Sequence, residues 1–107
     1  MQKEVEAFLD QYGLRVKPEI RYLDFVGEVG ELGRKILCSN DYGSRPFSVT
    51  SEVEEKAGEC LFSLVALFAE CGIDAEATLQ DILAAYRKRM SELGESNADA
   101  VCPQVNQ

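Results

Sequence analysis

The stretch FVGEVGELGRKIL, residues 25–37, places two carboxylates on a segment that is otherwise rich in apolar residues and glycine. Glu28 and Glu31 are three residues apart, so on a helix they lie on one stripe, one turn from each other. Apolar residues flank this stripe on two tracks, and both tracks are expected to be buried. The first track is Ile20, Leu23, Val26, Gly30, Gly33 and Leu37, and the second is Phe25, Val29, Leu32 and Ile36.

Gly27, Gly30 and Gly33 recur at every third position of the stretch. A glycine costs a helix interior up to about 1 kcal/mol relative to alanine, so we expect a neighbouring backbone to approach closely there. The charged stripe between the tracks has two interpretations, a solvated face with pairs at i,i+4 or a functional face. Its members are Arg21, Asp24, Glu28, Glu31 and Lys35.

The chain on either side of this stretch predicts two helices and a loop. Apolar residues at helical spacing indicate a short helix over residues 2–12. The helix that carries the two glutamates is expected over residues 18–37, with Pro18 in its first turn, where the missing N–H costs nothing. Residues 38–50 are rich in Ser, Asn, Asp, Gly and Pro, a composition typical of a loop.

A third helix is expected over residues 51–71, where Ser51 and Glu54 match a capping box and Gly72 ends the pattern. Its second half, CLFSLVALFA at residues 60–69, carries no charge and is apolar on all sides. Such a segment is typical of a helix at the centre of a fold.

Asp74 is placed to cap a fourth helix that ends before Gly94. Basic residues near its end suit the helix dipole, which is one sufficient reason for their presence. They are Arg87, Lys88 and Arg89. The apolar residues of this helix recur at spacings of three and four, as an amphipathic helix requires. They are Leu79, Ile82, Leu83, Tyr86, Met90 and Leu93.

The length of 107 residues fits one domain. We expect an all-α, four-helix domain over residues 1–93, with residues 94–107 as a mobile tail. Net charge −8 argues against nucleic-acid and membrane partners, because both need clustered Lys and Arg. No apolar run approaches the roughly 20 residues of a membrane span, and the N-terminus lacks an apolar signal core, so a cytoplasmic protein is expected.

Cys38, Cys60, Cys71 and Cys102 show no C-x-x-C spacing, and the chain contains no histidine. This pattern argues against a zinc site and predicts reduced thiols, with Cys60 and Cys71 as small core residues. Because the chain contains no histidine, Ser-His-Asp and Cys-His catalysis are excluded. Any chemistry is therefore left to carboxylates, Lys, Tyr and bound cations.

The third helix begins with a second group of acidic residues, Glu52, Glu54, Glu55 and Glu59. If two acidic helix starts face each other, their carboxylates remain ionised and buried only when a cation neutralises them. Carboxylate oxygens favour a hard cation, Mg²⁺ or Mn²⁺.

Three segments, in this order, resemble the MazG-type, all-alpha nucleoside triphosphate pyrophosphohydrolases, in particular their short, dCTP pyrophosphatase-like members. The segments are VGEVGEL at 26–32, GECLFSLVAL at 58–67 and GIDAEATL at 72–79. The resemblance covers about residues 18–90. It implies a four-helix fold and magnesium-dependent hydrolysis of standard or modified nucleoside triphosphates to the monophosphate and pyrophosphate. Because a four-helix unit of this size cannot bury both apolar tracks, we also expect a homodimer or homotetramer that covers the second track.

The resemblance also implies a metal site of four carboxylates, carried as E-x-x-E and then E-x-x-D on consecutive helices. Glu28 and Glu31 match the first pair, and Glu59 stands at the Asp of the second. Lys56 stands where the family has the remaining Glu, and Glu55, at i−4 from Glu59, can substitute for it because it lies on the same helical face.

Glu31 is the candidate general base, with Glu28 as the second catalytic carboxylate. In the fourth helix Tyr86 stands in place of the family's usual Asn, so other residues are candidates for phosphate contacts, each with an ordinary surface charge as the alternative. They are Lys35, Lys56, Arg87 and Lys88. The alternative function is a catalytically degenerate helical protein of the same fold that binds nucleotides or a protein partner.

Overall fold

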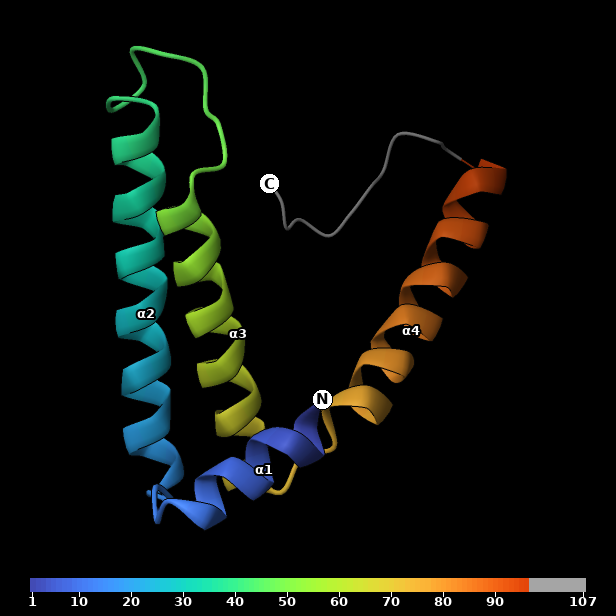
Figure 1. Cartoon of the computed structure of the whole chain (residues 1–107). Coiled ribbons are helices and arrows are strands. Elements are labelled where there is room, and N and C mark those ends of the chain that lie inside the picture. Colours follow the sequence, from blue (N-terminus) through green and yellow to red (C-terminus); the bar gives the residue numbers. More distant parts are fainter. Residues whose placement is uncertain (97–107) are drawn as a thin grey trace. The chain divides into compact units, whose positions relative to one another are not determined.

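The computed structural model describes residues 1–96, and the regular structure in this range is entirely α-helical. The all-α fold class is therefore confirmed. Figure 1 shows the four helices. They are α1 (Gln2–Gln11), α2 (Pro18–Ser39), α3 (Ser51–Cys71) and α4 (Ala75–Ser96). No helix in the described part of the chain is long and apolar enough to cross a membrane.

The chain forms two compact units, of which the first is Met1–Asp74 and the second begins at Ala75. In the first unit, α2 and α3 run antiparallel and side by side, and α1 packs against α3 (Figure 1). The second unit consists of α4 within the described residues. The α2–α3 pair therefore brings the two acidic helices together.

The start of α3 is set by Thr50, whose hydroxyl accepts a hydrogen bond of 3.1 Å from the backbone N–H of Val53. Thr50 is extended, as an N-cap residue must be, whereas Ser51 is already the first helical residue. The predicted capping box of Ser51 and Glu54 is therefore wrong by one residue. With Thr50 as the cap, the third helical position is Val53, which cannot return a side-chain hydrogen bond.

Proline and glycine set other helix boundaries as predicted. Pro18 stands at the first position of α2. Gly72 ends α3 in the left-handed region, with φ 70°, and the N–H of the following Ile73 donates to the carbonyl of Phe68 at 2.9 Å. This αL ending favours glycine, because a Cβ is disfavoured at positive φ.

The core of the first unit is built around α3, which packs against both α2 and α1. Its most buried apolar residues are Leu9 from α1 and Val53, Cys60, Val65 and Ala66 from α3. Phe8 of α1 adds an edge-to-face contact with Phe62, with ring centroids 5.8 Å apart. Residues 60–69 were predicted to form a helix at the centre of the fold. One side of this segment is buried as predicted, whereas the other side is exposed at Leu61. Of the cysteines predicted to be buried, Cys60 is buried and Cys71 is exposed, and both are free thiols.

Only part of the apolar surface of α2 is covered within the first unit. Phe25, Leu32 and Ile36 are half-buried, whereas Leu23 is 63% exposed. Other large apolar residues of α2 are also exposed, namely Ile20, Val26, Val29 and Leu37. Burial on two sides is therefore not achieved by the first unit alone.

The glycines of α2 have open space around them. A Cβ built on Gly27, Gly30 or Gly33 meets no heavy atom within 4 Å outside the local helix backbone. The expectation that a neighbouring backbone approaches them closely is therefore wrong within the first unit. Since nothing in the first unit occupies that space, these glycines weaken the helix without a visible compensation there.

The helix α4 has the predicted amphipathic pattern, and its own unit does not cover the apolar stripe. Leu79, Ile82, Tyr86 and Met90 are all exposed. The helix begins directly after Asp74 and continues to Ser96, three residues past the predicted end. The remainder of the predicted tail, residues 97–107, lies outside the described residues.

Candidate functional site

The charged stripe of α2 lies against α3 and forms what we term the ion-pair seam. Three residues of α2, spaced at intervals of seven, each pair with a residue of α3. Residues seven apart lie on nearly one line of a helix, so the seam follows the helix–helix contact. The pairs are Arg21–Glu70 at 3.7 Å, Glu28–Lys56 at 3.6 Å and Lys35–Glu52 at 3.9 Å. The stripe is therefore not simply a solvated face.

The middle of the seam holds one ammonium group between two carboxylates. The Nζ of Lys56 donates a 2.9 Å hydrogen bond to Oε1 of Glu59 and lies 3.6 Å from Oε1 of Glu28. The side chains of Lys56, Glu28 and Glu59 are 25%, 32% and 43% exposed, so the group is open to solvent on one side. Together with Glu31 these residues form what we term the acidic face.

The carboxylates of the acidic face raise the pKa of Lys56. The hydrogen bond to Glu59 is the largest cause of the raised pKa of Lys56, and the charges of Glu59, Glu28 and Glu31 raise it further against the effect of burial. The same hydrogen bond lowers the pKa of Glu59. At neutral pH Lys56 is therefore an ammonium and Glu59 a carboxylate.

Glu28 has one oxygen that is not satisfied. Its Oε1 is buried and accepts no hydrogen bond. The ammonium of Lys56, at 3.6 Å, is beyond hydrogen-bond distance and supplies only charge. A buried acceptor without a donor costs free energy, so this oxygen is ready to receive a closer donor or cation.

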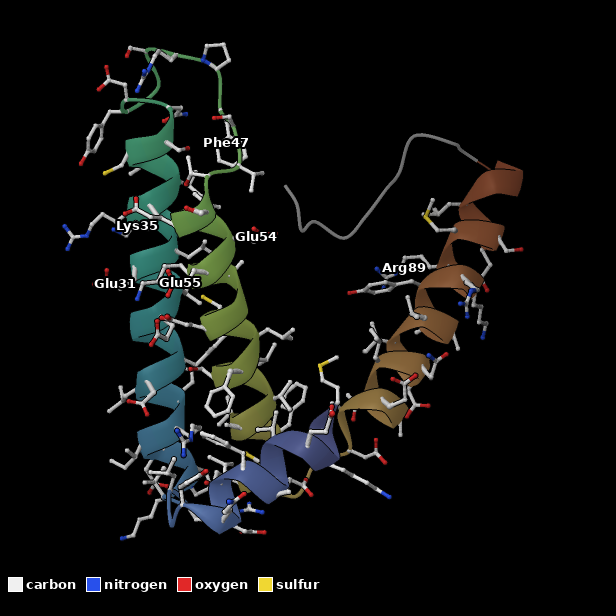
Figure 2. The ribbon with its side chains drawn as sticks, viewed as in Figure 1. Glu31, Lys35, Phe47, Glu54, Glu55 and Arg89 are labelled. Carbon is white, nitrogen blue, oxygen red and sulfur yellow. The ribbon has the colours of Figure 1, made fainter. Side chains whose placement is uncertain are left out.

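Glu31 and Glu55 lie at a similar height on α2 and α3 (Figure 2). Both side chains are exposed. Glu54, the neighbour of Glu55, lies on the side of α3 that faces away from α2 (Figure 2). Glu55 therefore remains a candidate for the edge of the acidic face, while Glu54 does not belong to it.

The acidic face fits a hard cation in its donor atoms but differs from the predicted metal site in one respect. Its carboxylates, Glu28, Glu31 and Glu59, are the ligand type that Mg²⁺ prefers, and Glu28 contributes an unsatisfied oxygen. Among residues 1–96, however, no three His, Cys, Asp or Glu side chains are arranged as a metal-binding group. The positive charge between Glu28 and Glu59 is the ammonium of Lys56.

Comparison of the chain with protein-family models, curated proteins and solved structures gives no match. The resemblance to the MazG-type family thus remains a prediction from its motifs. The arguments for function below therefore rest on the α2–α3 pair.

The other predicted phosphate-binding residues are Lys35, on α2, and Arg87 and Lys88, on α4. Lys35 belongs to the seam, where it pairs with Glu52. Arg87 and Lys88 are exposed on α4, in the second unit. Of the residues argued from the sequence, the structure therefore brings Glu28, Lys56 and Glu59 into contact. Glu31 lies near enough for its charge to raise the pKa of Lys56.

One charged cluster of the first unit was not predicted. The Glu70 carboxylate, 7% exposed, lies 3.7 Å from Arg21 and 3.5 Å from Arg15, and accepts a 3.1 Å hydrogen bond from the N–H of Val16. Arg21 also donates to the carbonyl of Leu14 at 2.7 Å. These bonds join the connector between α1 and α2 to the end of α3, which is a structural role.

A sequence signal for this cluster exists in hindsight. Arg21 precedes Glu28 by seven residues on the charged stripe, and Glu70 is the first charge after the apolar run of residues 60–69. A charge directly after such a run, on the helix expected at the centre of the fold, requires a buried partner of opposite sign. Arg21 is the positively charged residue of the stripe near the start of α2, which lies beside the end of α3 in the antiparallel pair.

Proposed function

We propose that the chain is a magnesium-dependent nucleoside triphosphate pyrophosphohydrolase that acts at its acidic face. One observation carries this proposal. Glu28 of α2 and Glu59 of α3, predicted from separate motifs to share one site, lie within 3.6 Å of a single ammonium nitrogen. Carboxylates from two packed helices thus face one point, which is where a shared cation or a phosphate chain would bind.

The residues have distinct proposed roles. Glu28, Glu31 and Glu59 hold the cation, with Glu55 as the fourth ligand, and Mn²⁺ can replace Mg²⁺ because both prefer oxygen. The cation supplies the positive charge that neutralises the phosphates and activates the attacking water. Glu31 is the proposed general base, because its side chain is exposed, whereas Glu28 and Glu59 are paired with the ammonium of Lys56.

We also propose that the protein assembles as a homodimer or homotetramer. Several large apolar residues of α2 remain exposed in the first unit, including Leu23, Val26 and Val29. Contiguous apolar surface on a soluble protein marks an interaction site. A second copy that covers this surface would bury the apolar residues that one copy leaves exposed. It would also place protein surface beside the acidic face.

Product analysis with a panel of standard and modified nucleoside triphosphates tests the activity. The proposal predicts monophosphate and pyrophosphate in the presence of Mg²⁺ or Mn²⁺ and no turnover with a chelator. Glu28→Gln should lose activity, whereas Glu54→Gln, on the side of α3 away from α2, should retain it. Release of orthophosphate and a diphosphate, or the absence of turnover across the panel, would overturn the proposal.

A second function is favoured by the position of Lys56. Its hydrogen bond to Glu59 and its ion pair with Glu28 already neutralise the acidic face without metal. This arrangement suits a catalytically degenerate protein that binds nucleotides or a protein partner. Saturable binding of a non-hydrolysable triphosphate, together with no turnover of any nucleotide in the panel, would favour this second function.

A further inference from the structure

Lys56 occupies the place from which a divalent cation would reach Glu28 and Glu59. Its Nζ is 2.9 Å from one carboxylate oxygen and 3.6 Å from the other. A cation that takes these oxygens as ligands must therefore remove the ammonium from between them. Like charges at such a distance repel, so Lys56 and the metal compete for the same two carboxylates.

The ammonium group can leave without unfolding the protein. The Lys56 side chain is 25% exposed, and lysine has a flexible stem that can carry its charge towards solvent. An ammonium moved away from Glu28 and Glu59 loses a hydrogen bond and an ion pair. The move is favoured when an anion outside the carboxylate pair receives the charge.

A polyphosphate is an anion of the required kind. Lysine binds phosphate oxygens as a compact point charge. The chain carries a net charge of −8, so a bare polyphosphate is repelled unless positive charges meet it at the binding site. Lys56 is the one basic side chain of the described residues that contacts both Glu28 and Glu59.

We propose that Lys56 is a displaceable counter-ion that couples the two ligands of the acidic face. The cation takes Glu28 and Glu59 when the ammonium of Lys56 moves to an oxygen of the polyphosphate chain. This inference rests on the proposed function, since it concerns how the metal and the substrate affect each other's binding at the same face. Because coupling between two ligands is reciprocal, each ligand should strengthen the binding of the other.

Calorimetric titration of the metal-free protein tests the first half of the coupling. MgCl₂ alone should bind Lys56→Met about tenfold more tightly than wild type, as expected when two partly exposed ion pairs no longer compete with the metal. Lys3→Met, which removes one charge from an exposed position of α1, is the matched control and should stay within about twofold of wild type. Lys56→Gln provides a second, polar variant, and circular dichroism verifies that each variant is folded.

Titration with preformed magnesium tripolyphosphate tests the second half. Here Lys56→Met should bind about fivefold more weakly than wild type, because the phosphate chain loses its ammonium partner. The effect of the same substitution on affinity thus has opposite signs for the two ligands. A purely structural effect of Lys56 would not produce this reversal. If Lys56→Met and Lys56→Gln shift both affinities in one direction, or shift neither beyond the Lys3→Met control, the inference is overturned.

The inference and the proposed function can fail separately. If wild type hydrolyses a triphosphate but the Lys56 variants change both affinities in the same direction, the coupling is rejected and the activity stands. The change of sign without hydrolysis of any nucleotide would support the coupling and reject the enzyme. The titrations measure binding alone, so their result does not depend on turnover.

Discussion

The ammonium nitrogen of Lys56 lies 2.9 Å from a carboxylate oxygen of Glu59, one turn further along α3. A pair at i,i+3 on one helix needs no tertiary structure, but the second carboxylate, Glu28, comes from α2. The acidic face is therefore a tertiary feature. It depends on the antiparallel packing that sets Glu28 opposite the first half of α3.

Replacement of Glu28 by Gln should abolish turnover while the fold is retained. The carboxylate provides charge to the acidic face, and its Oε1 accepts no hydrogen bond that the amide would lose. We expect at least about a hundredfold loss of activity, and a melting temperature within about 5 °C of wild type. Product assays and calorimetry measure the two effects. A larger fall in melting temperature would identify Glu28 as a structural residue instead.

Replacement of Glu55 by Ala tests whether this residue is the fourth metal ligand. Glu55 is exposed and precedes Lys56, and we expect Glu55→Ala to weaken magnesium binding about tenfold. Glu54→Ala is the matched control, because it removes the same charge from the side of α3 that faces away from α2. Equal affinities for the two variants would show that Glu55 is no ligand and that only the three carboxylates of the acidic face hold the metal.

The sequence was sufficient to predict the helices, because their boundaries depend on local chemistry. Pro18 and Gly72 act through their own backbone geometry, and both lie where predicted. The first residue of α3, Ser51, lies where predicted, but its cap was assigned one residue too late, because Thr50 and Ser51 are adjacent and both can cap a helix. A capping motif alone does not decide between two neighbouring hydroxyl residues.

The surroundings of the acidic face could be predicted only in part. Spacing placed Glu28 and Glu31 on one stripe, but the side of α2 that meets α3 depends on tertiary packing of residues such as Phe25 and Leu32. For this reason the stripe could be interpreted as solvated. The sequence also marked Lys56 as a departure from the family pattern, but the position of its ammonium requires both helices.

The exposed side of α2 predicts self-association. Light scattering at micromolar concentration should show a dimer or tetramer, because the exposed apolar surface around Leu23 favours a second copy. Leu23→Glu should shift the protein towards the monomer without loss of helicity, since this side chain is 63% exposed in the single chain. Lys3→Met, which also lowers the net charge by one but on α1, should leave the mass of the assembly unchanged. A monomeric wild-type protein would contradict the proposed assembly.

Gly30 offers a test of the empty space beside α2. Because a Cβ there meets no atom within 4 Å, Gly30→Ala should stabilise the protein by about 0.5–1 kcal/mol through helix propensity. Denaturant unfolding measures this difference. Gly72→Ala is the opposite case, since φ 70° is strained for alanine, and it should destabilise. A loss of stability in Gly30→Ala would show instead that the backbone of a second copy packs against this position.

The Lys56–Glu59 pair should contribute to stability over a limited range of pH. The pKa of Glu59 is lowered from its ordinary value of 4.5, so its contribution is present above that value and is lost as pH falls through the lower, folded-state pKa. The pKa of Lys56 is raised from 10.5, so its contribution is complete below that value and is lost as pH rises through the higher, folded-state pKa. The stability difference between wild type and Lys56→Met should therefore be constant from about pH 5 to about pH 10 and diminish on both sides. Calorimetric unfolding across this range measures the difference. A difference that varies between pH 6 and pH 9 would assign the effect of Lys56 to groups other than Glu59.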